Sequence, residues 1–154
     1  MKAKATILTA ALCFVGAALG FGDDAHMGTW KLNQTKSELS PMAPKNSTVA
    51  YEAAGDNVKV TVDGTDSDGK PTHNEWMGKF DGKDYAVIGD PNSDERSYTK
   101  IDDRTLGFNS KRDGKRTAGG RIEVSTDGKT RTVTTRGIDS KGNKIISIEV
   151  YDKQ

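Results

Sequence analysis

Few residues of this 154-residue chain are of the types that carry out acid–base or nucleophilic chemistry. His26 and His73 are its two histidines, and Cys13 is its single cysteine. His73 and Glu75 are two residues apart, so on a strand their side chains share one face, where they form either a solvated charged pair or an acid–base pair. The chain has no Gly-x-Ser-x-Gly elbow, no His-Glu-x-x-His and no P-loop. We therefore predict a solvated pair, no catalytic residues and a protein that is not an enzyme.

The acidic, glycine-rich stretch from Asp63 to Gly69 resembles a calcium loop in composition. An EF-hand loop requires Gly at its sixth position and Glu at its twelfth. Counted from Asp63, these positions hold Asp68 and Asn74, and counted from Asp66, the fifth position is Lys70. Both registers fail, so we predict a hairpin connection, with weak calcium binding as the alternative. The sequence predicts no metal site and no cofactor.

The N-terminus has the composition of an export signal. Lys2 and Lys4 precede an uncharged apolar run over residues 5–19, and Ala18-Leu19-Gly20 or Gly20-Phe21-Gly22 provides small residues for cleavage. The apolar run is shorter than the roughly 20 residues that a membrane-spanning helix needs. We predict a signal peptide over residues 1–22, a secreted or periplasmic location, and one domain over residues 23–154. Residues 23–27 are polar, and we expect them to form a loose arm.

Removal of this leader also removes Cys13 and two lysines. The mature chain then has 21 basic and 22 acidic residues, a net charge of −1, and no disulfide. A nucleic-acid partner would require a clustered basic face, so none is predicted. No later segment is long and apolar enough to span a membrane. The sequence specifies neither an oligomeric state nor a protein partner.

After residue 27 the chain alternates between apolar and polar residues with a period of two, which is typical of half-buried β-strands. In residues 57–62, for example, Val58, Val60 and Val62 share one face. The pattern predicts strands over residues 28–33, 47–53, 57–62, 72–80, 85–88, 97–101, 105–109, 120–125, 130–136 and 144–151.

Turn signals separate these segments. Asp-Gly-Lys occurs at Asp68, Asp81, Asp113 and Asp127. Glycine adopts the positive φ that tight hairpin turns require, and Asp stabilises such turns with local hydrogen bonds. Consecutive hairpins without crossover helices indicate an all-β antiparallel up-and-down meander of about 8–10 strands. Closing the meander into a barrel removes its exposed edges.

The stretch Gly28-Thr29-Trp30-Lys31-Leu32-Asn33 resembles the entry motif of lipocalins and their calycin relatives. Together with "HNEWMGKFDGKDYAVIGDPN" and the C-terminal "VYDKQ", it resembles a group of small secreted bacterial proteins of lipocalin-like type. The resemblance implies a lipocalin-like barrel in which Gly28 and Trp30 form a plug at one end. It also implies that an Arg from a late strand stacks on the indole of Trp30. Arg121, Arg131 and Arg136 are the candidates, and we select Arg136.

The aromatic residues suggest where a ligand would bind. Asn74, Trp76, Gly78 and Phe80 share a face, and we expect Gly78 to leave a gap between two rings with Trp76 at the centre of the cavity wall. The predicted ligand-binding residues are Val60, Val62, Trp76, Phe80, Tyr85, Tyr98 and Phe108.

Two functions follow from alternative contents of the lumen. An open lumen predicts an exported lipocalin-like binding protein for a small apolar or amphipathic ligand in the cell envelope, as the resemblance implies. If these aromatic residues instead fill the barrel, we expect an envelope protein-interaction or inhibitor module with no small-molecule ligand, which binds through its loops.

Overall fold

The computed structural model describes residues 24–41, 43–138 and 141–154. The predicted signal peptide lies outside these residues. The described residues form ten strands and one 3-10 turn: β1 (Gly28–Leu32), η2 (Gln34–Lys36), β2 (Lys45–Ala54), β3 (Asn57–Thr65), β4 (Pro71–Gly78), β5 (Tyr85–Ile88), β6 (Glu95–Asp102), β7 (Thr105–Arg112), β8 (Lys115–Val124), β9 (Thr130–Ile138) and β10 (Lys144–Lys153). No helix among them is long and apolar enough to cross a membrane.

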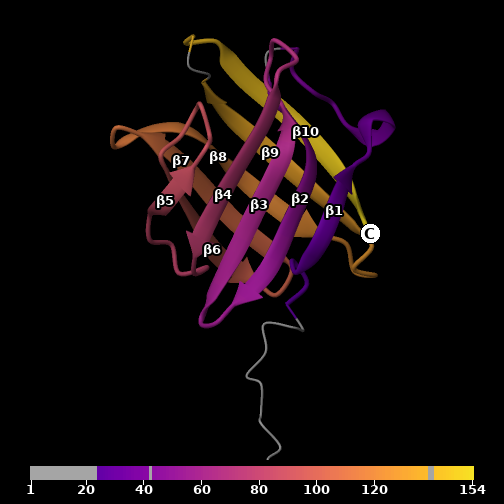
Figure 1. The fold of residues 1–154 in the computed structure, drawn as a ribbon. Helices are drawn as coiled ribbons and strands as arrows, with labels where there is room; N and C mark the ends of the chain where they lie inside the picture. The colour runs from indigo at the N-terminus through magenta and orange to yellow at the C-terminus, as the bar shows by residue number, and fades with distance from the viewer. Residues whose placement is uncertain (1–23, 42, 139–140) are drawn as a thin grey trace, which may run out of the picture.

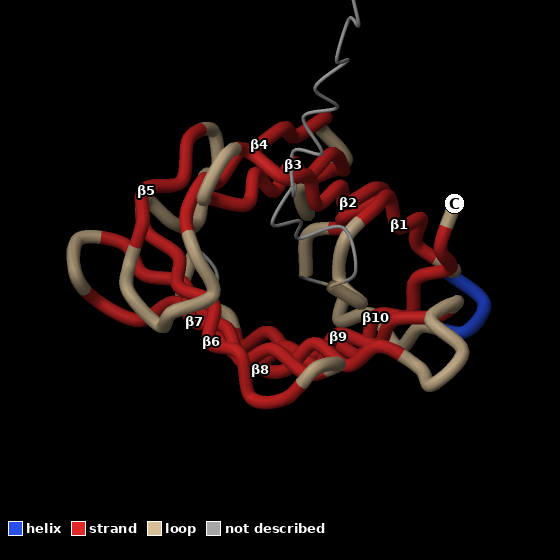
Figure 2. The backbone as a smooth tube through the Cα atoms, turned by 90° about the horizontal axis from the view of Figure 1, so that it is seen from below, coloured by secondary structure: helices blue, strands red, loops and turns tan. Residues whose placement is uncertain are grey.

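The strands form a closed antiparallel barrel. Each strand pairs with its neighbours in sequence, and β1 pairs with both β2 and β10, which closes the sheet (Figures 1 and 2). The predicted up-and-down meander is therefore confirmed, and its ten-stranded closed form fits a calycin-type or lipocalin-like fold. The shortest ladders lie on either side of β5, where two residue pairs join β5 to β4 and two join it to β6.

Alternation along the strands determines which residues enter the lumen. Val58, Val60 and Val62 of β3 are buried, and they pair with Gly78, Trp76 and Asn74 of β4, respectively. The predicted inward face of residues 74, 76 and 78 is thus confirmed. His73 and Glu75 point outward, where His73 Nδ1 lies 2.6 Å from Asp63 Oδ1 and Lys59 Nζ lies 2.8 Å from Glu75 Oε1.

The turns follow from local hydrogen bonds, as predicted. At the β3–β4 connection, Asp66 Oδ1 accepts hydrogen bonds from the backbone N–H groups of Asp68 and Lys70, both at 2.9 Å. Gly69 adopts a φ of +81° in this turn. The Asp63–Gly69 stretch is therefore the end of β3 followed by a hairpin connection.

The two ends of the barrel differ in how they are filled. We call the end that receives residues 24–27 the arm end, and the opposite end the mouth. Near the arm end the lumen holds a packed aromatic cluster of Tyr51, Trp76, Phe80 and Tyr98, in which Trp76 and Tyr98 have ring centroids 4.8 Å apart. Towards the mouth the lumen is hollow.

Residues 24–27 plug the arm end, so the prediction of a loose arm is wrong for the described part of that segment. His26 is fully buried, and its ring lies edge-on to Phe80 with centroids 6.4 Å apart. The Nε1 of Trp30 donates a 2.9 Å hydrogen bond to the carbonyl oxygen of His26. Asp24 anchors the arm through an ion pair of 3.5 Å with Lys100 on β6. The polar composition of the arm concealed these contacts.

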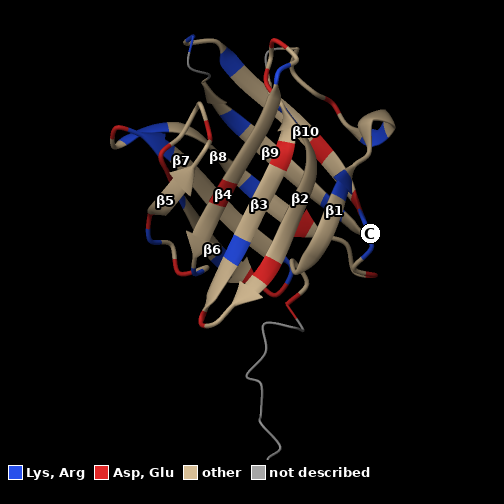
Figure 3. Ribbon diagram, in the orientation of Figure 1, with Lys and Arg blue, Asp and Glu red and all other residues tan. Residues whose placement is uncertain are grey.

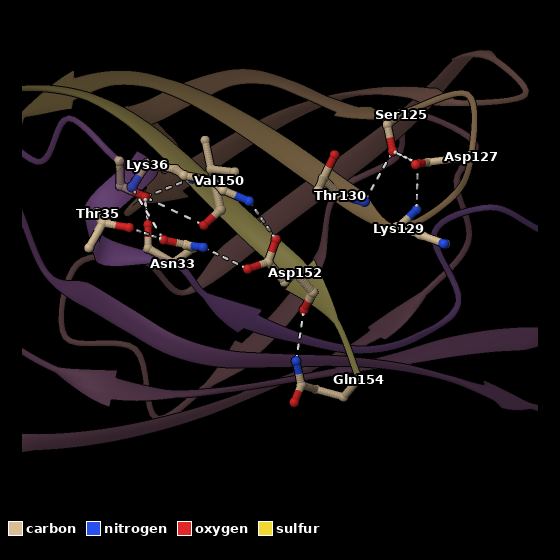
Figure 4. Close-up of polar contacts among 11 residues, drawn as sticks. Asn33, Thr35, Lys36, Ser125, Asp127, Lys129, Thr130, Val150, Asp152 and Gln154 are labelled. Carbon is tan, nitrogen blue, oxygen red and sulfur yellow. Dashed lines mark hydrogen bonds and ion pairs between the residues drawn. The ribbon is translucent and has the colours of Figure 1, made fainter.

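The outer surface carries charges of both signs, which are interspersed along the strands and loops (Figure 3). A polar cluster on this surface attaches η2 to the end of β10 (Figure 4). Asn33 caps η2 by accepting from the Lys36 N–H, and its Nδ2 donates a 2.7 Å hydrogen bond to Asp152. Ser37 Oγ accepts from the backbone N–H of Val150 at 2.9 Å. These bonds hold the β1–β2 connection against the closing strand.

Candidate ligand-binding site in the barrel lumen

A cavity of about 150 Å³ occupies the lumen between the packed aromatic cluster and the mouth. At the mouth it reaches the connecting loops, where Pro44, Asp66 and Pro91 border it, and the end of β9 at Ile138. An engineered apolar cavity of about this volume binds benzene. The space therefore suits a ligand of about one ring.

The walls of the cavity combine apolar and polar side chains from most of the strands. Apolar wall residues include Val49, Val62, Tyr98, Phe108, Ile122 and Val133. Polar wall residues include Asn74, Asp90, Arg96, Ser110, Arg131 and Glu149. Such a mixture suits an amphipathic molecule, because the apolar groups supply contact area and the few polar groups orient the ligand.

Arg131 of β9 lies at the floor of the cavity. Its guanidinium carbon is 5.7 Å from the ring centroid of Trp30, 4.9 Å from that of Tyr51 and 5.1 Å from that of Tyr151. The expectation that a late-strand Arg stacks on Trp30 is met by Arg131, and the selection of Arg136 is corrected. Residues 131, 133 and 135 point into the barrel and Arg136 is exposed on the outer face, so strand parity excludes it.

Arg96 of β6 is the second buried guanidinium, and a carboxylate of the protein is its counter-ion. Its Nη2 lies 3.0 Å from Asp90 Oδ2, and its Nε is 3.4 Å from Ser110 Oγ. Asp90 Oδ2 also accepts from the hydroxyl of Ser93 at 2.5 Å. The Arg96–Asp90 pair thereby connects β6 to the β5–β6 loop at the mouth.

Glu149 of β10 is a buried carboxyl group in the cavity wall. Tyr151 donates a 2.5 Å hydrogen bond to its Oε2. Burial raises the pKa of Glu149, while the Tyr151 hydrogen bond and the charge of Arg131 act to lower it. Burial likewise raises the pKa of Tyr51 and that of Tyr151. Both phenols therefore remain protonated near neutral pH.

Three of the predicted ligand-binding residues, Val62, Tyr98 and Phe108, line the cavity, and four do not. Val60 and Trp76 are fully buried one layer closer to the arm end. Phe80 packs beside Trp76, with centroids 6.5 Å apart and the two rings nearly parallel. Tyr85 packs edge-on to Trp76 at 5.7 Å. The sequence identified the inward faces but not the level along the barrel at which the lumen becomes hollow.

The expected gap at Gly78 is filled by Tyr85, which corrects the proposal of a cavity centred on Trp76. A Cβ atom built on Gly78 would lie 2.5 Å from Cγ of the Tyr85 ring and 2.7 Å from Cζ2 of Trp76. Trp76 Nε1 is also occupied, because it donates a 2.8 Å hydrogen bond to the carbonyl oxygen of Arg96. Glycine is thus required here because two rings pack directly over it.

Among the charged wall residues, Arg96 and Glu149 were missed in the sequence, and Arg131 was considered only as a partner of Trp30. All three are buried in the structure. For Arg131 the available signal was a charged residue on the same face as Val133, since buried charges are rare unless they are paired or functional. For Glu149 the alternation misleads, because Ile146 and Ile148 of β10 lie on the exposed outer face.

Comparison with known proteins found similar solved structures, but no matching family model. No family model matches the sequence, and no curated protein matches it. Among solved structures, that of EF1p2_mFAP2b bound to DFHBI aligns with a TM-score of 0.47 and 13% identity, over 84% of this chain and 94% of that chain. A redesigned beta barrel, mFAP1, also bound to DFHBI, aligns with a TM-score of 0.44 and 14% identity, over 84% and 95% of the two chains.

Proposed function

We propose that this protein is a non-catalytic binding protein for a small amphipathic molecule, which it holds in the mouth half of the barrel lumen. The observation that carries the proposal is the cavity of about 150 Å³ with both apolar and hydrogen-bonding walls. It favours this function over the alternative of an interaction module with a filled barrel. The aromatic cluster supplies a rigid floor, so the site is preformed and little ordering entropy opposes binding.

The proposal is tested with a panel of one-ring compounds that differ in their polar group. Benzyl alcohol, benzamide, benzoate and benzylamine are titrated into the protein by calorimetry. At least one of them should bind with 1:1 stoichiometry. A panel in which no compound binds, neutral or charged, would overturn the proposed function.

A pair of variants locates the site. Ala118 of β8 lines the cavity, and Ala118→Leu should reduce the binding of every compound that the wild type binds, because the added methyl groups occupy the lumen. Arg121, three residues along the same strand, is exposed on the outer face. Arg121→Leu is the matched control and should leave binding unchanged. Equal effects of the two substitutions would place the ligand elsewhere.

We also propose that the protein acts in the cell envelope or outside the cell, on the basis of the leader-like residues 1–22. N-terminal sequencing of the protein from its natural host should find chains that begin after Gly20 or Gly22. Chains that retain Lys2 and Lys4 would contradict export with cleavage.

A further inference from the structure

Arg131 is a buried cation without a hydrogen-bonding counter-ion. The side chain is 3% exposed, and its Nε and Nη1 atoms are buried without a hydrogen-bond partner. A buried charge that lacks such partners is costly, so native proteins pair it or bind something to it. The three rings around the guanidinium attract it electrostatically, but its Nε and Nη1 make no hydrogen bond to the hydroxyl groups of Tyr51 and Tyr151.

The other buried charges in the lumen do not supply that acceptor. Asp90 is engaged by Arg96 and Ser93. Glu149 accepts from Tyr151, and the Nε and Nη1 atoms of Arg131 make no hydrogen bond to its carboxyl group. Arg96 shows how this barrel satisfies a guanidinium when both partners come from the protein. Arg131 departs from that pattern at the floor of the cavity.

We propose that the ligand is a small organic acid whose carboxylate pairs with Arg131, while its apolar part lies against Val62, Tyr98 and Phe108. This inference rests on the proposed function and specifies the ligand class. A guanidinium presents parallel N–H donors that match the two oxygens of a carboxylate, and such charge-assisted bonds are the strongest class of hydrogen bond in proteins. The cavity of about 150 Å³ limits the apolar part to about one ring or a short branched chain.

Benzoate and benzamide provide the test, because they are nearly isosteric and differ in charge. Calorimetric titration of the wild-type protein at neutral pH should show benzoate binding about tenfold tighter than benzamide, or more, since hydrogen bonds to charged groups are stronger than neutral ones. Benzamide or benzyl alcohol binding as tightly as benzoate would overturn the acid assignment and leave the proposed binding function standing. Absence of binding by the whole panel would overturn both.

The resonance of the Arg131 Nε–H reports the contact without any substitution. Benzoate should shift this signal and slow its exchange with water, and benzamide should change it less. An Nε–H signal that benzoate leaves unchanged while it binds would show that the carboxylate lies elsewhere. Titration with sodium chloride distinguishes an organic acid from an inorganic anion. Chloride that binds at Arg131 as tightly as benzoate would overturn the assignment of an organic ligand.

Two substitutions then distinguish a specific contact with Arg131 from an effect of the protein's net charge. Arg131→Gln should abolish the preference for benzoate over benzamide, provided that near-ultraviolet circular dichroism shows a folded barrel. Arg136→Gln removes one positive charge from the exposed face of the same strand and should leave the preference intact. Loss of the preference in both variants would assign it to the net charge of the protein and not to the site.

Discussion

Trp30 closes the arm end with its indole ring. The indole is fully buried, its Nε1 has the carbonyl of His26 as partner, and the cations of Arg131 and Lys153 lie 5.7 Å and 5.1 Å from the ring centroid. Gly28, two residues earlier, has a φ of +104°, a region that L side chains rarely adopt. The Gly-x-Trp step therefore combines a glycine with positive φ and a large buried ring.

Trp30→Ala should destabilise the protein by about 3–5 kcal/mol, because it removes a large core side chain and leaves a cavity. The free energy of unfolding from a denaturant melt measures this effect. Tyr85→Ala is a useful comparison because Tyr85 is only partly buried, and it should cost less. A Trp30→Ala melt with an unchanged midpoint would show that Trp30 is not a structural plug.

His26 makes stability depend on pH. Burial lowers the pKa of His26 from 6.5 to about 4; Asp24 and Asp102 act to raise it, and Arg131 and Lys100 act to lower it further. Between pH 6.5 and pH 4 the unfolded chain binds a proton at this residue and the folded protein does not. The contribution of neutral His26 is therefore complete above pH 6.5 and declines as the pH falls, by up to about 3 kcal/mol near pH 4.

The measurement is the difference in unfolding free energy between the wild type and His26→Leu at a series of pH values. Taking the difference cancels groups with the opposite slope, such as Glu149 and His73, whose pKa values are raised in the fold. The wild type should lose stability relative to the variant from pH 6.5 to pH 4. A difference that is constant over this range would contradict the burial of a neutral imidazole.

At the scale of elements, β3 and β4 illustrate what period-two patterning predicts. The alternation of residues 72–80 placed Asn74, Trp76 and Gly78 on the inner face, and the structure agrees. The alternation contains no information on the height of each residue above the floor, because that height depends on strand tilt and on the register with distant strands. For this reason Val62 and Val60 were both predicted at the site, although only Val62 lines the cavity.

The same limit explains the late-strand arginine. Arg131 and Arg136 lie five residues apart on β9 and therefore on opposite faces. Parity assigns Arg131 to the inner face with Val133, but which inward residue reaches Trp30 depends on the closure of β1 onto β10. His26 was missed for a related reason, since a polar segment before the first strand has no pattern that indicates burial.

Gly78→Ala tests the packing of β4 against Tyr85 at the start of β5. The new methyl group would meet the Tyr85 and Trp76 rings at 2.5–2.7 Å, so we expect a loss of about 1–3 kcal/mol through overpacking. Gly107 in β7 is a matched strand glycine, whose added Cβ would find its nearest neighbour at an ordinary 3.5 Å. Gly107→Ala should stay within about 0.5 kcal/mol of the wild type in chemical melts. Equal costs at the two positions would contradict the close approach of Tyr85.

At the scale of the whole molecule, the two halves of the lumen differ: the arm-end half is packed and the mouth half is hollow. The arm-end half is filled by the plug and the aromatic cluster, and it provides the buried apolar area that stabilises the fold. The mouth half is less densely packed, and its wall includes buried polar atoms without a hydrogen-bond partner, namely Asn74 Oδ1 and Arg131 Nε and Nη1. A binding protein can use this arrangement because the stable half holds the site in a fixed geometry.

Methyl resonances distinguish the two halves of the lumen, because one strand contributes methyl groups to both. In a benzoate titration followed by ¹H–¹³C spectra, the methyl groups of Val62, Val133 and Ile145, which line the cavity, should shift. Those of Val58 and Val60, on the same strand as Val62 but in the packed half, should shift much less. Shifts centred on Val58 and Val60, or on the exposed Ile146 of the outer face, would contradict a ligand site in the mouth half of the barrel.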